Sequence, residues 1–266
     1  MKIILIRYYK WIAYSILLLL LAPTIVLFVN GTVAGNTAFT LLIIEGFIGF
    51  GLISFIKGLL MKGTLRTLYE KCDPFTFLKE ATAFADGERE KRMKLNFLNW
   101  KLIALLNCNR LSEALETQKS MESKFDTKIP LGLKATFAVS FASLSVARQE
   151  LSLAEEWLHK AEQLSKDKNF RPLELKRVAH ALRINRCEID IMLAKYEGCE
   201  DVLQDILEFE VRKSVIIRAH FLLGKLFYNQ KRLEDAKVEL QFVLDHGNQL
   251  PEVAAAKELI ESGGLQ

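Results

Sequence analysis

Two distant segments of the chain repeat the same short pattern. NCNRLSEALE at residues 107–116 and NQKRLEDAKV at residues 229–238 share the order Asn, two variable residues, Arg, Leu, a polar or acidic pair and Ala. LSLAEEWLHKA at 151–161 and GCEDVLQDIL at 198–207 keep parts of it, with Cys199 and Val202 replacing Leu and Ala. The aligned small residues lie 40, 48 and 34 residues apart, at Ala114, Ala154, Val202 and Ala236. Such spacings indicate stacked helical units.

The sequence around these segments is also helical in character. After residue 61, apolar residues recur every three or four positions, as in Leu95, Leu98, Leu102, Leu105 and Leu106, and no stretch alternates with period two. Asp73-Pro74 is typical of a helix start. The charged stretch GEREKRMK at 87–94 is interpreted as the solvated start of another helix. We therefore predict an all-α protein.

The N-terminal part is too apolar for a water-soluble surface. Residues 11–29 carry no charge and reach roughly 28 Å as a helix, which matches a hydrocarbon core. A second apolar run extends from Ala38 to about Leu60 and is interrupted only by Glu45 and Lys57. A cleaved signal peptide is the competing interpretation, but the second run follows at once. These runs predict a two-helix transmembrane hairpin over residues 1–60.

The charges that flank the hairpin predict its orientation. Basic residues precede the first run and close or follow the second, whereas the connecting NGTVAGNT is uncharged. The positive-inside rule then places both termini in the cytoplasm of an integral membrane protein, with the cell membrane as the expected location. The lipid bilayer is accordingly one expected partner.

Glu45 has two interpretations. A carboxylate within a span is costly and usually faces a partner or a wet cavity, and Gly46, Gly49 and Gly51 follow it, so a homo-oligomer through the hairpin is conceivable. Alternatively, Glu45 lies near the outer interface of the membrane and reaches water.

Composition and motifs exclude several function classes. Of 36 basic and 32 acidic residues, four basic residues and one acid lie in residues 1–60, so the remainder carries 36 − 4 = 32 against 32 − 1 = 31. This near-equal balance lacks the excess of positive charge that is typical of nucleic-acid-binding proteins. Phosphate-loop, zinc-protease and nucleophile-elbow motifs are missing, so we expect no enzyme activity, no cofactor and no metal. The four cysteines are expected to be reduced: Cys72, Cys108, Cys187 and Cys199.

The repeated units resemble the tetratricopeptide repeat (TPR) family, in which each unit is two antiparallel helices. In the last unit, Leu223, Gly224 and Phe227 match the family's Leu, Gly and Tyr positions of the first helix, and Ala236 matches the small residue of the second. The resemblance implies a TPR-like α-solenoid over residues 95–266 with a C-terminal capping helix from Pro251, joined to the hairpin by a helical connector at 61–94.

The family binds peptides or helices on the face made by the first helices of successive units. Carried onto this chain, the resemblance implies the following partner-binding residues: Asn96, Asn99, Trp100, Thr136, Ser140, Arg218, Phe221 and Lys225. A family subgroup grips a C-terminal carboxylate with Lys, Asn and Arg, but those positions here hold Asn99, Ile103, Ser140, Ile184 and Glu188. An apolar or amphipathic segment is thus the expected ligand.

Together these features predict a membrane-anchored scaffold that binds a protein or peptide partner at the cytoplasmic face. The alternative is a membrane subunit whose hairpin oligomerises or forms a transport assembly through Glu45, with regulatory repeats.

Overall fold

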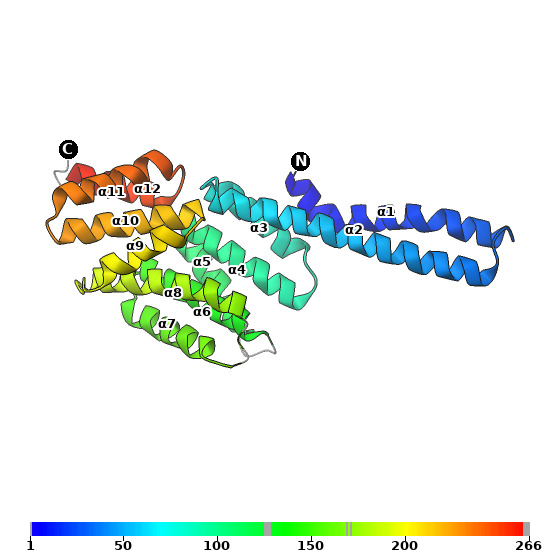
Figure 1. Cartoon of the computed structure of the whole chain (residues 1–266), viewed down its shortest axis with the longest axis horizontal. Helices are drawn as coiled ribbons and strands as arrows, with labels where there is room; N and C mark the ends of the chain where they lie inside the picture. The colour runs from blue at the N-terminus through cyan, green and yellow to red at the C-terminus, as the bar shows by residue number, and fades with distance from the viewer. Residues whose placement is uncertain (1, 125–128, 169, 171, 263–266) are drawn as a thin grey trace.

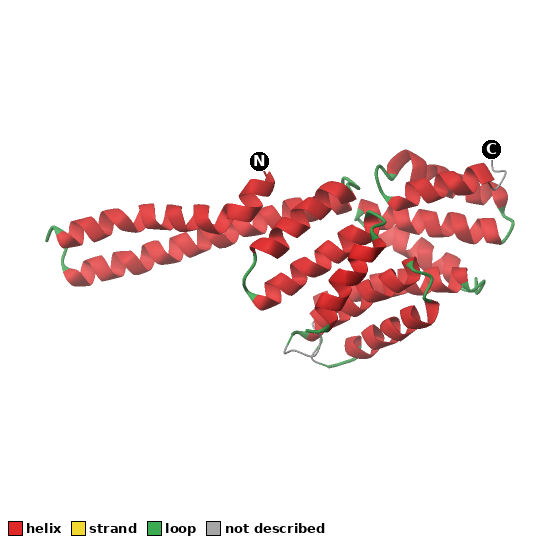
Figure 2. Ribbon diagram, turned by 180° about the vertical axis from the view of Figure 1, so that it is seen from behind, coloured by secondary structure: helices red, strands yellow, loops and turns green. Residues whose placement is uncertain are grey.

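The structure is a computed structural model that describes residues 2–124, 129–168, 170 and 172–262, and within these residues every regular element is a helix (Figure 2). This confirms the predicted all-α class. In chain order the helices are α1 (Lys2–Val29), α2 (Gly35–Tyr69), α3 (Pro74–Gly87), α4 (Lys91–Asn107), α5 (Leu111–Glu122), α6 (Leu131–Ala147), α7 (Leu151–Ser165), α8 (Pro172–Met192), α9 (Cys199–Phe209), α10 (Lys213–Asn229), α11 (Leu233–His246) and α12 (Pro251–Ser262).

Helices α1 and α2 form an antiparallel hairpin that projects from the other helices (Figure 1). Both helices are long and apolar enough to cross a membrane. Their outward side chains are large and apolar, as at Leu19, Phe47 and Phe50, which are 74%, 76% and 69% exposed. The two helices approach closely at Gly49, where a Cβ atom would lie only 2.3 Å from Leu17 Cδ1. Exposed apolar surface of this extent is stable in lipid rather than in water.

Helix α2 runs without interruption past the predicted hairpin end at residue 60 and stops at Tyr69. Its last three turns bury Leu60, Thr64 and Leu68 and pack against α3. The boundary between hairpin and connector therefore falls inside one helix, and the same helix belongs to both parts.

The repeated sequence pattern corresponds to a repeated turn. Asn109, Gln149 and Lys231 follow α4, α6 and α10 in the left-handed conformation, with φ of 55°, 62° and 64°. The N–H of the next residue donates at 2.9 Å to a carbonyl in the last turn of the preceding helix: Arg110 to Leu105, Glu150 to Ser145, and Arg232 to Phe227. This arrangement closes the helix C-terminus. The next helix then begins at Leu111, Leu151 and Leu233.

The third repeat departs from this pattern. Helix α9 begins at Cys199, which aligns with the three leucines, but Ala194 and Gly198 both have positive φ in a longer turn. The small residues Ala114, Ala154 and Ala236 are fully buried, whereas in α9 Leu203, one position after Val202, is fully buried. Ile206 is fully buried as well, four positions after Val202, so the departure is local to the first turns of α9.

Packing links each helix to its successor and also joins α4 to α6, α6 to α8 and α8 to α10. One continuous hydrophobic cluster extends from Ile6 in the hairpin to Ala256 in α12. In the helix pair α10–α11, Gly224 allows close approach, because a Cβ there would lie 2.7 Å from Leu240 side-chain atoms.

The last helices fold back to the end of α2 (Figure 1). Asn248 Nδ2 donates to the Lys71 carbonyl at 2.8 Å, and the Gln249 N–H donates to the Cys72 carbonyl at 3.3 Å. The Arg212 guanidinium lies 5.4 Å from the centre of the Tyr69 ring. The turn before α12 is therefore fixed to the turn after α2, and the two ends of the helical array are in contact.

Candidate functional site

Three of the residues predicted to bind a partner are buried, so the prediction is wrong for them. Asn99, Trp100 and Ser140 are 1%, 9% and 5% exposed. The Trp100 ring packs among aromatic rings of α3 and α4, with its centre 5.2 Å from that of Phe97 and 6.2 Å from that of Phe84. The Ser140 hydroxyl donates to the Thr136 carbonyl within α6. Trp100 is therefore a packing residue, and Ser140 hydrogen-bonds within its own helix.

The other five predicted residues retain partial exposure: Asn96, Thr136, Arg218, Phe221 and Lys225. Phe221 and Lys225 lie one turn apart on α10, and the Lys225 ammonium is 5.7 Å from the centre of the Phe221 ring. An aromatic ring beside a cation is thus presented on one helix face, as the spacing of the two residues predicts.

A row of polar contacts, which we call the polar strip, crosses α6, α8 and α10. It consists of Ser143, Asn185, Glu188 and Arg218. Asn185 is 1% exposed, and its amide donates to Ser143 Oγ at 2.9 Å and to the Val139 carbonyl at 3.2 Å. Its Oδ1 accepts from Arg218 Nη2 at 2.9 Å, and Arg218 also pairs with Glu188. The polar strip therefore links α6, α8 and α10 through side-chain contacts.

The charge on the polar strip is already balanced within the chain. Burial lowers and the Glu188 carboxylate raises the pKa of Arg218, with a net increase that keeps the guanidinium charged. Burial raises the pKa of Glu252 at the start of α12, although the nearby positive charge of Arg218 opposes this. Because Arg218 is paired with Glu188 of its own chain, a partner's carboxylate would have to displace Glu188.

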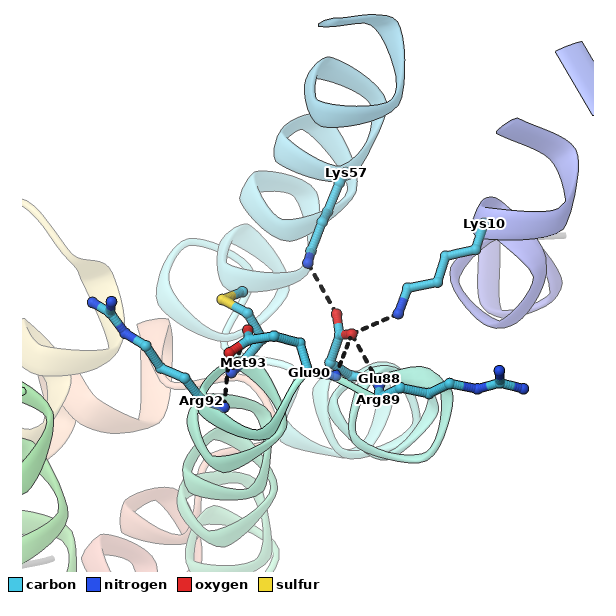
Figure 3. Close-up of polar contacts among 7 residues, drawn as sticks. All are labelled: Lys10, Lys57, Glu88, Arg89, Glu90, Arg92 and Met93. Atoms are coloured by element: carbon cyan, nitrogen blue, oxygen red, sulfur yellow. Dashed lines mark hydrogen bonds and ion pairs between the residues drawn. The ribbon is translucent and has the colours of Figure 1, made fainter. Parts of the chain in front are cut away.

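A second set of polar contacts, the hairpin clasp, fixes the hairpin to α3. It consists of Lys2, Lys10, Lys57, Glu80 and Glu88. Lys10 Nζ and Lys57 Nζ, one from each apolar helix, contact Glu88 Oε1 and Oε2 at 2.5 and 2.9 Å (Figure 3). Lys2 Nζ contacts Glu80 Oε1 at 2.6 Å. Both acidic side chains are only 3% exposed.

The surroundings of Glu88 favour its charged form strongly. Burial alone would raise its pKa, but hydrogen bonds from Lys10, Lys57 and the backbone N–H of Glu90 outweigh this effect and lower the pKa from 4.5 to about 2. The backbone N–H of Arg89 also donates to Glu88 Oε1 at 2.9 Å. Glu88 is therefore a buried anion that accepts hydrogen bonds from the hairpin and from its own turn.

The expectation that residues 87–94 are solvated is wrong at Glu88. Glu90 does act as a helix start, because its carboxylate accepts the N–H groups of Arg92 and Met93. The clasp was not predicted from the sequence because its members are far apart in the chain. The spacing of its lysines and glutamates is nevertheless a signal for it. Lys2 and Lys10 are eight residues apart, as are Glu80 and Glu88, and the Lys2–Glu80 and Lys10–Glu88 pairs each join residues 78 positions apart.

Glu45 faces α1. Its Oε1 accepts a hydrogen bond from Thr24 Oγ1 at 2.7 Å, and Thr24 is 4% exposed. Among the described residues, Glu45 Oε2 is buried without a hydrogen-bond partner. The side chain thus turns into the hairpin interface, and one of its oxygens has unused hydrogen-bonding capacity.

The cysteines are free thiols, and Cys72, Cys187 and Cys199 are buried. Burial raises the pKa of Cys108 to about 11 and that of Cys187 to about 12, which suppresses thiolate reactivity. Within the described ranges, no group of three or more His, Cys, Asp or Glu side chains could hold a metal ion.

Comparison with protein-family models, curated proteins and solved structures gave no match.

Proposed function

We propose that this chain is an integral membrane scaffold with cytoplasmic termini, whose TPR-like helix pairs hold a protein or peptide partner at the cytoplasmic face of the membrane. The observation that carries the proposal is the continuity of α2, which belongs both to the apolar hairpin and to the first cytoplasmic helix pair. A partner bound to these helices would be held at a fixed position relative to the bilayer.

The hairpin clasp supports the same role. Breaking a buried ion pair by removing one partner costs roughly 3 to 5 kcal/mol, so Glu88 opposes separation of the hairpin from α3. An anchor that only tethered the domain would need no such fixation. Membrane attachment would also raise the effective concentration of the scaffold for partners in the same membrane.

The partner-binding face that we propose is smaller than the sequence predicts. It comprises Asn96, Thr136, Phe221 and Lys225, with Arg218 at its polar base. Aromatic residues next to charged groups commonly dominate binding energy. Because Arg218 is already paired with Glu188, the expected ligand is an amphipathic segment that uses the Phe221 ring and places an acid near Lys225.

Substitution at Phe221 and Lys225 tests this face. A photoreactive residue at Asn96 of the full-length protein should cross-link a discrete partner in cells. Phe221→Ala combined with Lys225→Glu should reduce this cross-link at least about tenfold, since hot-spot truncations commonly cost 2 kcal/mol or more. Phe221 also packs against the edge of the main hydrophobic cluster, so the melting temperature of the purified protein should fall, but by less than in Gly224→Leu, because both side chains are partly exposed.

Gly224→Leu is the matched control on the same helix. It should unfold the α10–α11 pair, because its side chain would occupy the space of Leu240. If the double substitution melts the domain as severely as Gly224→Leu, Phe221 is a packing residue and the proposed face is wrong.

Glu45 supports a second candidate function, in which the hairpin oligomerises or forms a transport assembly and the repeats are regulatory. The unpaired Oε2 atom favours it, because a second hairpin could supply the missing donor. Under the scaffold proposal, Glu45→Gln should leave membrane insertion and cross-linked oligomer distribution unchanged, because Gln can still accept from Thr24. Loss of a membrane oligomer at normal expression would favour the second function.

A further inference from the structure

The turn between α3 and α4 presents a group of basic side chains, which we call the basic corner. It consists of Arg89, Lys91, Arg92 and Lys94, all of them exposed. Three acids lie near these cations. Glu88 contacts the lysines of the clasp, Glu90 accepts the N–H groups of α4, and Asp86 is exposed at the end of α3. The exposed positive charges therefore exceed the exposed negative charges of Asp86 and Glu90 by 4 − 2 = 2.

The clasp places the basic corner at a defined depth. Lys10 immediately precedes the first apolar stretch and Lys57 lies near the end of the second, and both contact Glu88. Trp11 and Tyr14 are 68% and 56% exposed just beyond Lys10, where aromatic side chains typically mark the membrane interface. In Figure 1 the α3–α4 turn points along the hairpin, in the direction of its apolar tip. In Figure 3 the Arg89 and Arg92 side chains extend to opposite sides of Glu88.

We propose that the basic corner binds the headgroups of anionic phospholipids in the leaflet that the hairpin enters. This inference rests on the membrane anchoring put forward under Proposed function. Basic clusters on the cytoplasmic side of a membrane helix are attracted to anionic lipids. Here α3 separates the cluster from α2 in the sequence, and only the fold brings it back to the membrane surface.

Lipid fits the corner better than an acidic protein does. The Glu88 carboxylate holds the turn against Lys10 and Lys57, so the exposed cations lie where the apolar surface of the hairpin ends. A phospholipid bilayer that covers this apolar surface brings its phosphates to the same level. A soluble acidic protein would have to enter the space between the corner and the headgroups.

The test uses full-length protein in nanodiscs of phosphatidylcholine with a minor fraction of phosphatidylglycerol. Native mass spectrometry after release counts the lipids of each class that stay bound. The triple variant Arg89→Gln, Lys91→Gln and Arg92→Gln is compared with a control triple variant at exposed distal lysines: Lys195→Gln, Lys231→Gln and Lys257→Gln. Both remove three positive charges and leave the clasp intact.

A basic residue near an anionic surface contributes about fivefold in affinity. We therefore expect the corner variant to lose at least about tenfold of the preference for phosphatidylglycerol, while the control variant retains it. High salt should weaken the preference of the wild type. Equal retention in the corner variant and the wild type would overturn the inference, as would equal loss in both triple variants. Partner cross-linking and carbonate extraction test the scaffold and its anchor separately, so their failure is distinguishable.

Discussion

Glu88 combines three tasks in one side chain. It accepts hydrogen bonds from both apolar helices and from the N–H groups of its own turn. The basic side chains of the adjoining basic corner remain exposed. A neutral residue of the same shape could not do this, because each lysine requires a negative partner when it is mostly removed from water. The junction between hairpin and repeats thus depends on one buried charge.

The lowered pKa of Glu88 predicts how the junction responds to acid. Because the folded pKa is about 2 and the ordinary value is 4.5, the ionised carboxylate contributes stability above pH 4.5 that is lost as the pH falls toward 2. Thermal unfolding of the full chain in detergent should show Glu88→Gln less stable than wild type at pH 7, with a smaller difference at pH 3.

Glu113→Gln is the control for this experiment, because its ion pair with Arg110 is largely exposed. It should change the melting temperature little at either pH. A pH profile of Glu88→Gln that runs parallel to that of the wild type would show that Glu88 does not carry the acid response.

At the level of elements, the repeated turn explains why distant segments look alike. The pattern Asn-x-x-Arg-Leu corresponds to a helix end, a residue in the left-handed conformation and the start of the next helix. At each occurrence the N–H of the Arg donates to a carbonyl in the last turn of the preceding helix. Gln149, Ala194 and Lys231 adopt this conformation without the freedom of glycine.

Ala194 is the position where this strain should be measurable. Its φ is 57°, and alanine has no side-chain group to stabilise the left-handed conformation. Ala194→Gly should therefore raise the free energy of unfolding by up to about 1 kcal/mol, measured by denaturant titration. Ala254→Gly, at an exposed position inside α12, should lower it by about 1 kcal/mol. Destabilisation by Ala194→Gly would contradict the assigned turn.

The sequence predicted those features that depend on local pattern. Periodicity predicted the two apolar helices and the all-helical class. Self-similarity aligned Leu111, Leu151, Cys199 and Leu233 as equivalent positions, and in the structure each of them begins a helix. The clasp and the polar strip were not, because they join residues far apart in the chain. Trp100 was misplaced for a related reason: its burial depends on Phe77 and Phe84 of α3, which had been assigned to a connector.

At the scale of the whole molecule, hairpin and helix pairs share one hydrophobic cluster, and the array returns to the end of α2. The apolar hairpin and the helices that share this cluster should therefore unfold together. The position of the whole array relative to the membrane then depends on the orientation of the hairpin.

Cysteine labelling tests that orientation. Ala34 is exposed in the loop at the tip of the hairpin, so Ala34→Cys should react with an impermeant thiol reagent on intact cells. Lys257→Cys in α12 should react only after the membrane is opened. The native thiols give little background, since Cys72 is fully buried and the pKa of Cys108 is raised. Labelling at Lys257→Cys from outside would reverse the topology.

The unbroken course of α2 from Gly35 to Tyr69 also makes the helix a lever. A hairpin whose apolar length differs from the thickness of the bilayer tilts to match it. With no hinge between membrane and repeats, the same tilt rotates the first helix pair and everything packed on it. The angle at which Phe221 and Lys225 meet a partner would then follow the thickness of the surrounding bilayer.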